Sequence, residues 1–338
     1  MTDKTTHTPR KLSFRERNRR SGGYLMRRKV GSIVVSIVRA ILLIGLCFMV
    51  VQPLLTRFLQ GLMPQKELYD STVRLIPRNP TLDNYRLIFE LTYLPKSLLN
   101  TAWISLLISL CQVICATLVG YAFARFEFPL KKMWFAFVVL LIIVPPQTLQ
   151  VPLYLHFMNF DVFGIFKAIT GKPLALRGSI WPYTMMSLTC MGLKNGLFIF
   201  LLREYFKSVP MSLEEAAYVD GCSNMHTFLK IMLPDAMPII ASCFLFSFVW
   251  QWTDIFYTEN FLTGFTTLSS AMASLSTAVT NHFTSDPNAL GAVTKVSEAV
   301  QTQMASISIL ICCVPLIILY CFTQKTFVQS IVMSGSKE

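Results

Sequence analysis

The hydrophobicity pattern divides the chain into six long apolar runs separated by polar segments. The runs cover approximately residues 32–51, 98–122, 133–155, 179–202, 235–257 and 304–322. About 20 consecutive apolar residues suffice for a helix to cross the hydrocarbon core of a bilayer, where only helices and closed barrels satisfy their backbone polar groups. The pattern therefore predicts an all-α integral membrane protein with six transmembrane helices.

A basic segment precedes the first apolar run, as it does in a secretory signal peptide. The run is long enough to span a membrane, however, and no small-residue cleavage pattern follows it. We therefore expect an uncleaved first span after a polar tail of residues 1–30, a membrane domain over 31–333 and a short C-terminal tail of 334–338. Arg39 within the first span is expected to face protein or water, because charge at the bilayer centre is costly.

Two later runs are interrupted by polar residues or prolines. The third contains Pro145 and Pro146 followed by Gln147 and Gln150. Proline removes a backbone donor, so this run predicts either a kink that lines a solute pathway, with both glutamines offering hydrogen bonds, or the end of the helix and an outer loop. Lys194 in the fourth run is either a functional intramembrane residue or the mark of an interrupted helix or cavity entrance.

A polar passage between the fourth and fifth runs, residues 203–234, predicts two short helices joined by a corner. Ser212 is a candidate N-cap, and Glu215 three residues later completes a capping box. Asp220–Gly221 indicates the turn, because glycine tolerates a left-handed backbone. Ser223 or Asn224 begins the second helix, and Pro234 is expected to end it.

Each predicted helix of this passage has apolar residues at helical spacing. In the first, a compact apolar face is expected, and its two alanines would let another surface come close. In the second, the apolar positions recur every three or four residues. The first set is Leu213, Ala216, Ala217 and Val219, and the second is Met225, Phe228, Leu229 and Met232.

The fifth run ends in an aromatic and acidic cluster that contains Trp252 and Asp254. An aromatic face and a carboxylate together suit the recognition of a sugar, since the ring stacks on apolar sugar faces and the acid accepts hydroxyl protons. Trp is also enriched at membrane interfaces, and this second interpretation is the one we favour from the sequence.

Composition and charge exclude several classes of protein. The chain has 338 residues, of which 53% are hydrophobic and 14% charged, against about a quarter charged in soluble domains. Its net charge is +12, but ten of the thirty Lys and Arg residues precede residue 30, which favours a cytoplasmic tail at anionic lipid over a nucleic-acid surface. The nine cysteines predict no disulfide framework, and the four scattered histidines predict no metal site.

One motif in the 203–234 passage resembles a known family. The motif has the pattern E-A-A, three residues, G, nine residues, I-x-L-P. Its fixed positions are Glu215, Ala216, Ala217, Gly221, Ile231, Leu233 and Pro234. This pattern is the signature of permease subunits of bacterial binding-protein-dependent ABC importers. We therefore call residues 203–234 the coupling loop. The resemblance implies the six-helix permease fold of type I importers, with a cytoplasmic helix that docks into a cleft on the ATPase subunit.

The resemblance also implies partners and roles. The partners would be a second homologous permease, two ATPase subunits that hold ATP and Mg²⁺, and an extracytoplasmic solute-binding protein. Glu215 would pair with groups in the ATPase cleft, Ala216 and Ala217 would permit close approach, and Gly221 would set the corner angle. Leu233 and Pro234 would transmit motion to the fifth span. The chain itself has no phosphate-binding G-x-x-x-x-G-K-[S/T] sequence and is not expected to be an enzyme or to bind a cofactor.

Three segments are similar to the maltose-type, carbohydrate branch of the family. They are residues Asn79 to Arg86, the start of the second span, and residues Trp252 to Asp254 at the end of the fifth. Sugar import is therefore the expected function, with import of a polyamine or phosphate ester, or ion-coupled secondary transport, as alternatives. Six spans would place both termini and the coupling loop in the bacterial cytoplasm. The Ser/Thr-rich segment 259–303, with a turn at Asp286, would then lie outside, where it would be able to touch the binding protein.

Overall fold

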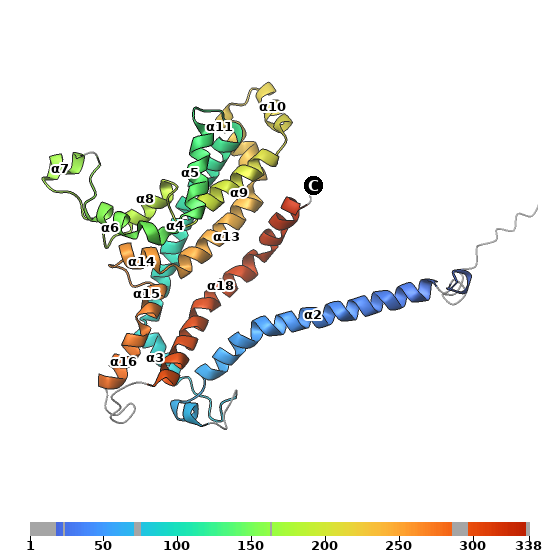
Figure 1. Cartoon of the computed structure of the whole chain (residues 1–338), viewed down its shortest axis with the longest axis vertical. Helices are drawn as coiled ribbons and strands as arrows, with labels where there is room; N and C mark the ends of the chain where they lie inside the picture. The colour runs from blue at the N-terminus through green and yellow to red at the C-terminus, as the bar shows by residue number, and fades with distance from the viewer. Residues whose placement is uncertain (1–17, 23, 71–75, 163, 286–296, 336–338) are drawn as a thin grey trace, which may run out of the picture. The chain divides into compact units, whose positions relative to one another are not determined.

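The computed structural model describes residues 18–22, 24–70, 76–162, 164–285 and 297–335, and the side chains up to Gln324 except that of Ser285. The beginning of the N-terminal tail, the Asp286 turn and residues 336–338 lie outside the described residues. Contacts divide the chain into two units, residues 1–59 and 60–338 (Figure 1).

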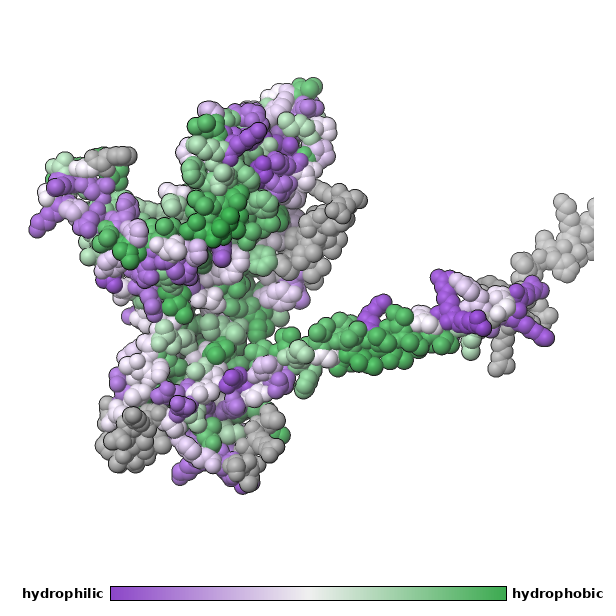
Figure 2. Space-filling model, viewed as in Figure 1, coloured by the Kyte–Doolittle hydropathy of each residue, from purple (hydrophilic) through white to green (hydrophobic). Residues whose placement is uncertain are grey.

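The first unit is dominated by a single long helix. Helix α2 (Tyr24–Gly61) has 38 residues, which corresponds to roughly 57 Å, and its last residues continue into the second unit. Its surface is hydrophobic over most of its length and hydrophilic at its N-terminal end (Figure 2). The helix is longer than the predicted span of 32–51 at both ends, and it includes residues 24–30 of the predicted tail.

The second unit consists of helices joined by short connections, and Phe160 and Leu174 form the isolated β-bridge of the described residues. Its elements are η1 (Gln65–Tyr69), α3 (Asp83–Leu91), α4 (Leu94–Arg125), α5 (Lys131–Ile143), η2 (Pro146–Leu149), α6 (Gln150–Met158), α7 (Ile165–Thr170), α8 (Trp181–Leu188), α9 (Asn195–Ser208), α10 (Met211–Val219), α11 (Asn224–Thr227), the π-helical turn η3 (Phe228–Met232), α12 (Leu233–Asp235), α13 (Met237–Thr253), α14 (Phe256–Phe261), α15 (Leu268–Ala273), α16 (Leu275–Ser285) and α18 (Glu298–Gly335).

Helix α4 lies at the centre of the second unit and packs against α8, α9 and α13. Small and polar residues recur every three or four positions along its buried side and let the neighbouring helices approach closely. They are Ser97, Thr101, Ser105 and Ser109 in the first half, and Gln112, Ala116 and Gly120 in the second. Thr101 also accepts the backbone N–H of Leu268 at 2.7 Å, which ties α4 to α15.

Two glycines fix the closest helix contacts. A Cβ at Gly120 would lie 2.9 Å from the Cβ of Leu202, so α4 and α9 touch almost backbone to backbone. A Cβ at Gly196 would lie 2.7 Å from the carbonyl oxygen of Val138, which shows the same closeness between α9 and α5. Helices α4, α5 and α9 therefore form one tightly packed group.

The predicted spans correspond to helices, but two of them are broken. In the third, α5 ends at Ile143, and the chain turns by 103° at Pro145 into η2 and α6. In the fourth, α8 ends at Leu188 and α9 begins at Asn195, with Lys194 in the break. Lys194 therefore marks an interrupted helix, one of the two interpretations that the sequence left open.

By length and apolar composition, three described helices are able to cross a membrane: α2, α4 and the Glu298–Gln324 part of α18. Two bent pairs also pass as single spans, namely α5 with η2–α6 and the Asn224–Asp235 segment with α13. The exact number of six spans stays a prediction, because the fourth predicted span consists of the two shorter helices α8 and α9.

The two ends of the second unit carry different elements. Helices α10 and α11 lie at one end, and α3 and α16 lie at the other (Figure 1). Hydrophilic residues gather at both ends, with hydrophobic surface between them (Figure 2). The coupling loop and the far part of segment 259–303 thus lie at opposite ends, and the described part of that segment is mostly helical, in α14, α15 and α16.

Candidate coupling surface and solute pathway

Helix α10 begins directly after Pro210, whose φ of −58° and ψ of 137° end the preceding segment. Ser212 therefore lies inside the first turn, and the predicted capping box between Ser212 and Glu215 is wrong, since no side chain caps this helix. Arg125 at the end of α4 ties down the start of α10 instead. Its Nη2 donates to the carbonyl of Val209 at 2.8 Å, and its Nη1 lies 3.4 Å from the Met211 sulfur.

The buried face of α10 is formed by Glu214 and Ala217, which are 2% and 4% exposed. The other members of the apolar face predicted from the sequence lie at the surface of the chain. Leu213 and Val219 are 42% and 88% exposed, and Ala216 is also exposed. A polar contact decides this orientation, because a buried ion pair turns Glu214 inward and leaves the flanking apolar residues at the surface.

That ion pair joins Arg125 to Glu214. The Arg125 Nε lies 2.8 Å from the Glu214 Oε1, and the two side chains are 8% and 2% exposed. Removing one partner of a buried pair leaves an uncompensated charge, which typically costs about 3–5 kcal/mol. The pair connects residues 89 positions apart, and it fixes α10 to the central helix α4.

The corner after α10 has the geometry expected for a glycine. Gly221 has a φ of +81°, its N–H donates to the Tyr218 carbonyl at 3.0 Å, and the N–H of Cys222 donates to the Ala217 carbonyl at 2.9 Å. These two bonds form a Schellman motif, which satisfies the last carbonyls of α10. The predicted turn at Asp220–Gly221 is therefore confirmed.

The second helix of the coupling loop begins with Ser223 as its N-cap, as predicted, and the Ser223 hydroxyl accepts the N–H of His226 at 3.4 Å. Phe228 and Met232 are buried, whereas Met225 and Leu229 are 64% and 50% exposed. The predicted stop at Pro234 is confirmed to within one residue. A π-helical turn and α12 carry the helix to Asp235, and a 72° bend then leads into α13.

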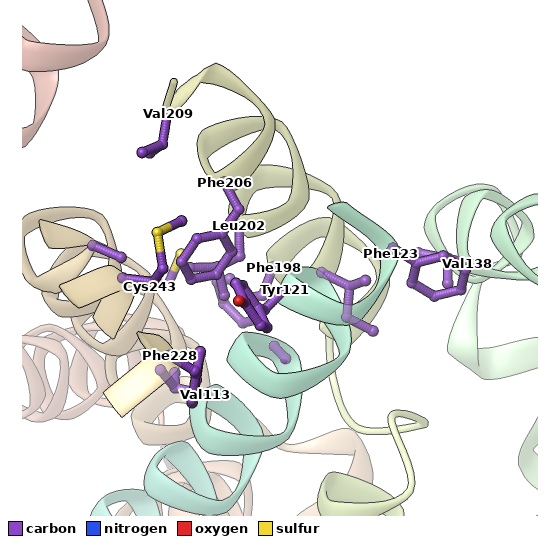
Figure 3. Packing of buried hydrophobic residues seen from close by; sticks show 14 residues of the cluster. Val113, Tyr121, Phe123, Val138, Phe198, Leu202, Phe206, Val209, Phe228 and Cys243 are labelled. Carbon is purple, nitrogen blue, oxygen red and sulfur yellow. The ribbon is translucent and has the colours of Figure 1, made fainter. Parts of the chain in front are cut away.

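A buried aromatic and aliphatic cluster anchors the coupling loop to the membrane helices. Tyr121 of α4 lies with its ring centroid 5.3 Å from that of Phe206 in α9 and 4.7 Å from that of Phe228 in η3. These rings meet together with Leu202 and Val209 in one cluster, seen in Figure 3. Leu233 packs against the same cluster, so both ends of the loop rest on it.

A hydrogen bond connects α9 to the bend after α12. The Tyr205 hydroxyl donates to the Asp235 carbonyl at 2.7 Å and lies 3.1 Å from the Asp235 carboxylate. Burial and the nearby carboxylate raise the pKa of Tyr205 to about 12, so its phenol stays protonated at neutral pH.

The signature residues of the coupling loop divide into exposed and anchored positions. Glu215, Ala216, Gly221 and Pro234 are exposed, Ala217 is buried, and Ile231 and Leu233 are half-buried. Exposed apolar side chains beside them come from Met211, Leu213, Val219, Met225 and Leu229. An exposed apolar surface with a firmly held base is typical of a protein-docking site.

The predicted pathway residues lie in two places, at the η2–α6 break and at the end of α13. Gln147 and Gln150 are exposed in η2 and at the start of α6, where Gln150 donates to the side chain of Asn260 at 3.1 Å. Trp252 is 3% exposed and donates its indole N–H to the Cys312 carbonyl at 3.2 Å, so its ring is buried between α13 and α18, and its position at a membrane interface stays a prediction. Asp254 is buried, and its carboxylate accepts the N–H groups of Tyr257 and Thr258 at 2.9 and 3.1 Å.

A buried polar network, which the sequence analysis missed, holds the break between α8 and α9. Gln112 of α4 donates to the backbone carbonyl of Leu193 and accepts from Ser247 at 2.5 Å and from Gln251 at 3.1 Å. Gln251 in turn accepts the hydroxyl of Tyr183. A single Gln within an apolar run carries little signal, because its partners lie far away in the sequence, in the α8–α9 break and in α13.

Comparison with known proteins identifies the family. The model of the family "binding-protein-dependent transport system inner membrane component" matches residues 116–331, more than half of the chain. The chain belongs to this family. The permease is 30% identical to the osmoprotective compounds uptake permease protein GgtD of Synechocystis over 245 residues, which cover 71% of this chain and 76% of that protein.

The permease is also 26% identical to the arabinooligosaccharides transport system permease protein AraQ of Halalkalibacterium halodurans, over 86% of this chain and 93% of that protein. Among solved structures it is similar to a chain of a bacterial ABC transporter involved in the import of alginate. That likeness has a TM-score of 0.62 and 19% identity, and it covers 88% of this chain and 98% of the other. The fold is thus that of an ABC importer permease.

Proposed function

We propose that this permease imports a carbohydrate, with an oligosaccharide as the favoured class, through an ATP-driven complex in the bacterial cytoplasmic membrane. The observation that carries the proposal is the coupling loop, whose exposed Glu215 and Ala216 lie on a helix that a buried ion pair fixes to the membrane core. The name of the similar arabinooligosaccharide permease and the Asn79–Arg86 phrase support the sugar class.

The complex that we propose contains a second homologous permease, two ATPase subunits and an extracytoplasmic solute-binding protein. ATP and Mg²⁺ would bind to the ATPase subunits. Both termini and α10 would lie in the cytoplasm, and α16 at the opposite end would lie outside. This orientation agrees with the basic residues that precede α2.

The anchoring contacts suggest how ATP-driven closure would reach the membrane helices. A force on α10 would pass through Glu214 and Arg125 to α4, and a force on α11 would pass through Phe228 to the aromatic cluster. Because α4, α5 and α9 are packed backbone to backbone, they would move as a rigid group. The broken helices α5–α6 and α8–α9 would supply the solute pathway, with Gln147 and Gln150 as candidate hydrogen-bonding residues.

Affinity purification of the permease from its native membranes in mild detergent tests the proposal. We expect an ATPase, a second permease and a solute-binding protein to co-purify, and the binding protein to bind a saccharide. Purification of the chain alone or as a homo-oligomer would contradict the importer and favour a secondary carrier. A binding protein that takes a polyamine or a phosphate ester, and no saccharide, would leave the importer intact and contradict the substrate class.

A further inference from the structure

A cavity of about 340 Å³ lies between the two helix breaks of the second unit. Residues 141–147 at the α5–η2 break form one wall, residues 191–194 at the α8–α9 break form another, and Tyr257 contributes from α14. Most lining residues are apolar, and the charged and amide side chains among them are Lys194 and Gln147. A cavity with an apolar wall and a few polar groups is the usual form of a small-molecule site.

Lys194 is exposed, and its charge has no ion-pair partner within the described part of the chain. No carboxylate lies within ion-pair distance of its ammonium group there, and none lines the cavity. The carboxylate of Asp254, three positions before Tyr257, is occupied by the N–H groups of Tyr257 and Thr258. A lysine inside a membrane segment is costly and typically pairs with an acidic group or marks a substrate path.

The backbone around Lys194 is held firmly in an uncommon conformation. Lys194 has a φ of +62°, and Cys190 at the other end of the break has a φ of +65°, a region that residues other than glycine seldom adopt. Gln112 binds the Leu193 carbonyl directly before Lys194, and the Asn195 amide directly after it donates to the Ser187 carbonyl at 3.2 Å. A strained lysine that its two neighbours fix in place indicates a functional constraint on the side chain.

We propose that this cavity is a subsite for an anionic group on the transported saccharide, a carboxylate as in a hexuronate or a phosphate as in a sugar phosphate. Lys194 would pair with the anion through a charge-assisted hydrogen bond, and Gln147 would bind neighbouring hydroxyls. Tyr257 and the prolines of the α5–η2 break would contact the apolar faces of the sugar ring. This inference rests on the proposed function as a sugar importer and refines its substrate class.

Uptake by the complete transporter in proteoliposomes, with its own binding protein and ATP, tests the subsite. The probes are a digalacturonate, a disaccharide phosphate and the corresponding neutral disaccharide. The variants are Lys194→Gln, Lys194→Arg and, as a matched control outside the cavity, the exposed Lys172→Gln. Co-purification of the ATPase with each variant shows that the complex is assembled.

We expect Lys194→Gln to lower uptake of an anionic saccharide at least tenfold, while Lys194→Arg and Lys172→Gln retain it. If Lys194→Gln loses uptake of only the digalacturonate or only the disaccharide phosphate, the probe that is lost identifies the anionic group that the subsite binds. Unchanged anionic uptake in Lys194→Gln, an equal loss of neutral and anionic uptake, or a wild type that imports only the neutral sugar would each overturn the subsite and leave the importer standing. A wild type that imports none of the saccharides would overturn both the substrate class and the subsite.

Discussion

Gly221 is the residue whose backbone determines the corner of the coupling loop. A β-branched side chain at its φ of +81° is strongly disfavoured, whereas asparagine tolerates that region. We expect Gly221→Val to weaken ATPase binding, because the two helices of the loop would change their angle, and Gly221→Asn to retain most of it. Co-purification of the ATPase with each variant measures the effect.

Space does not explain the requirement for glycine at this position. No atom lies within 4 Å of the point that a Cβ at Gly221 would occupy, so a side chain there would meet no neighbour. If Gly221→Val bound the ATPase as well as the wild type does, the corner angle would have no part in docking.

Arg125 and Glu214 make a second prediction at the scale of single residues. We expect Arg125→Met or Glu214→Met alone to lower stability by about 3–5 kcal/mol, since each leaves one buried charge unpaired. The double variant should recover most of that loss, because no charge is then stranded. Thermal unfolding of the purified permease in detergent measures all three, and additive losses in the double variant would show that the pair is not coupled.

Helix α10 presents two different faces, and substitutions on each should have different effects. Ala216 is exposed, so Ala216→Trp should leave stability nearly unchanged and block ATPase binding, and Glu215→Lys should act in the same way. Ala217 is 4% exposed, so Ala217→Trp should overpack the interior and destabilise the protein by about 1–3 kcal/mol.

Unfolding temperature and ATPase co-purification, measured on the same preparations, separate the two faces of α10. Normal ATPase binding by Ala216→Trp would show that docking uses another surface. Ser212→Ala serves as an internal control, because Ser212 does not cap the helix and its loss should cost less than about 0.5 kcal/mol.

The hydrogen bond from Tyr205 to Asp235 connects helix α9 to the bend before α13. We expect Tyr205→Phe to lower stability by about 1 kcal/mol. The pKa of Tyr205, raised from 10 to about 12, means that the native state retains the proton, so this contribution is complete below pH 10 and is lost as pH rises toward 12. The difference in unfolding temperature between wild type and variant should therefore stay constant from pH 7 to pH 9, and a difference that shrinks over this range would contradict the assignment.

At the scale of the whole molecule, the close contact of α4 and α9 makes a further prediction. A side chain at Gly120 would meet the Leu202 Cβ at 2.9 Å, so Gly120→Val should separate the two helices and destabilise the permease by about 1–3 kcal/mol. Leu118→Phe, which enlarges a half-exposed side chain of the same helix, should have little effect. The unfolding temperatures of the two variants are compared. Equal losses of stability would mean that the close contact of α4 and α9 at Gly120 has no special weight for stability.

The sequence predicted the class of fold because apolar runs of spanning length and the coupling motif are local signals. It did not predict that Glu214 faces inward, since its partner Arg125 lies on another helix. The broken fourth span was one of two interpretations, because Lys194 alone does not reveal the left-handed backbone at Cys190 and Lys194. The burial of Trp252 was not predicted for a similar reason, as its hydrogen-bond partner is a carbonyl of α18. For Glu214 and Trp252, the missing information is a contact between residues distant in the chain.

The link between Arg125 and Glu214 also bears on how such permeases are recombined. A chimera that receives residues 203–234 from a relative would exchange Glu214 but keep its own Arg125, together with the Tyr121 ring that supports Phe228. The transplantable module therefore has two pieces, the coupling loop and the last turns of α4. Swaps that move both pieces should yield working hybrids more often than swaps of the loop alone.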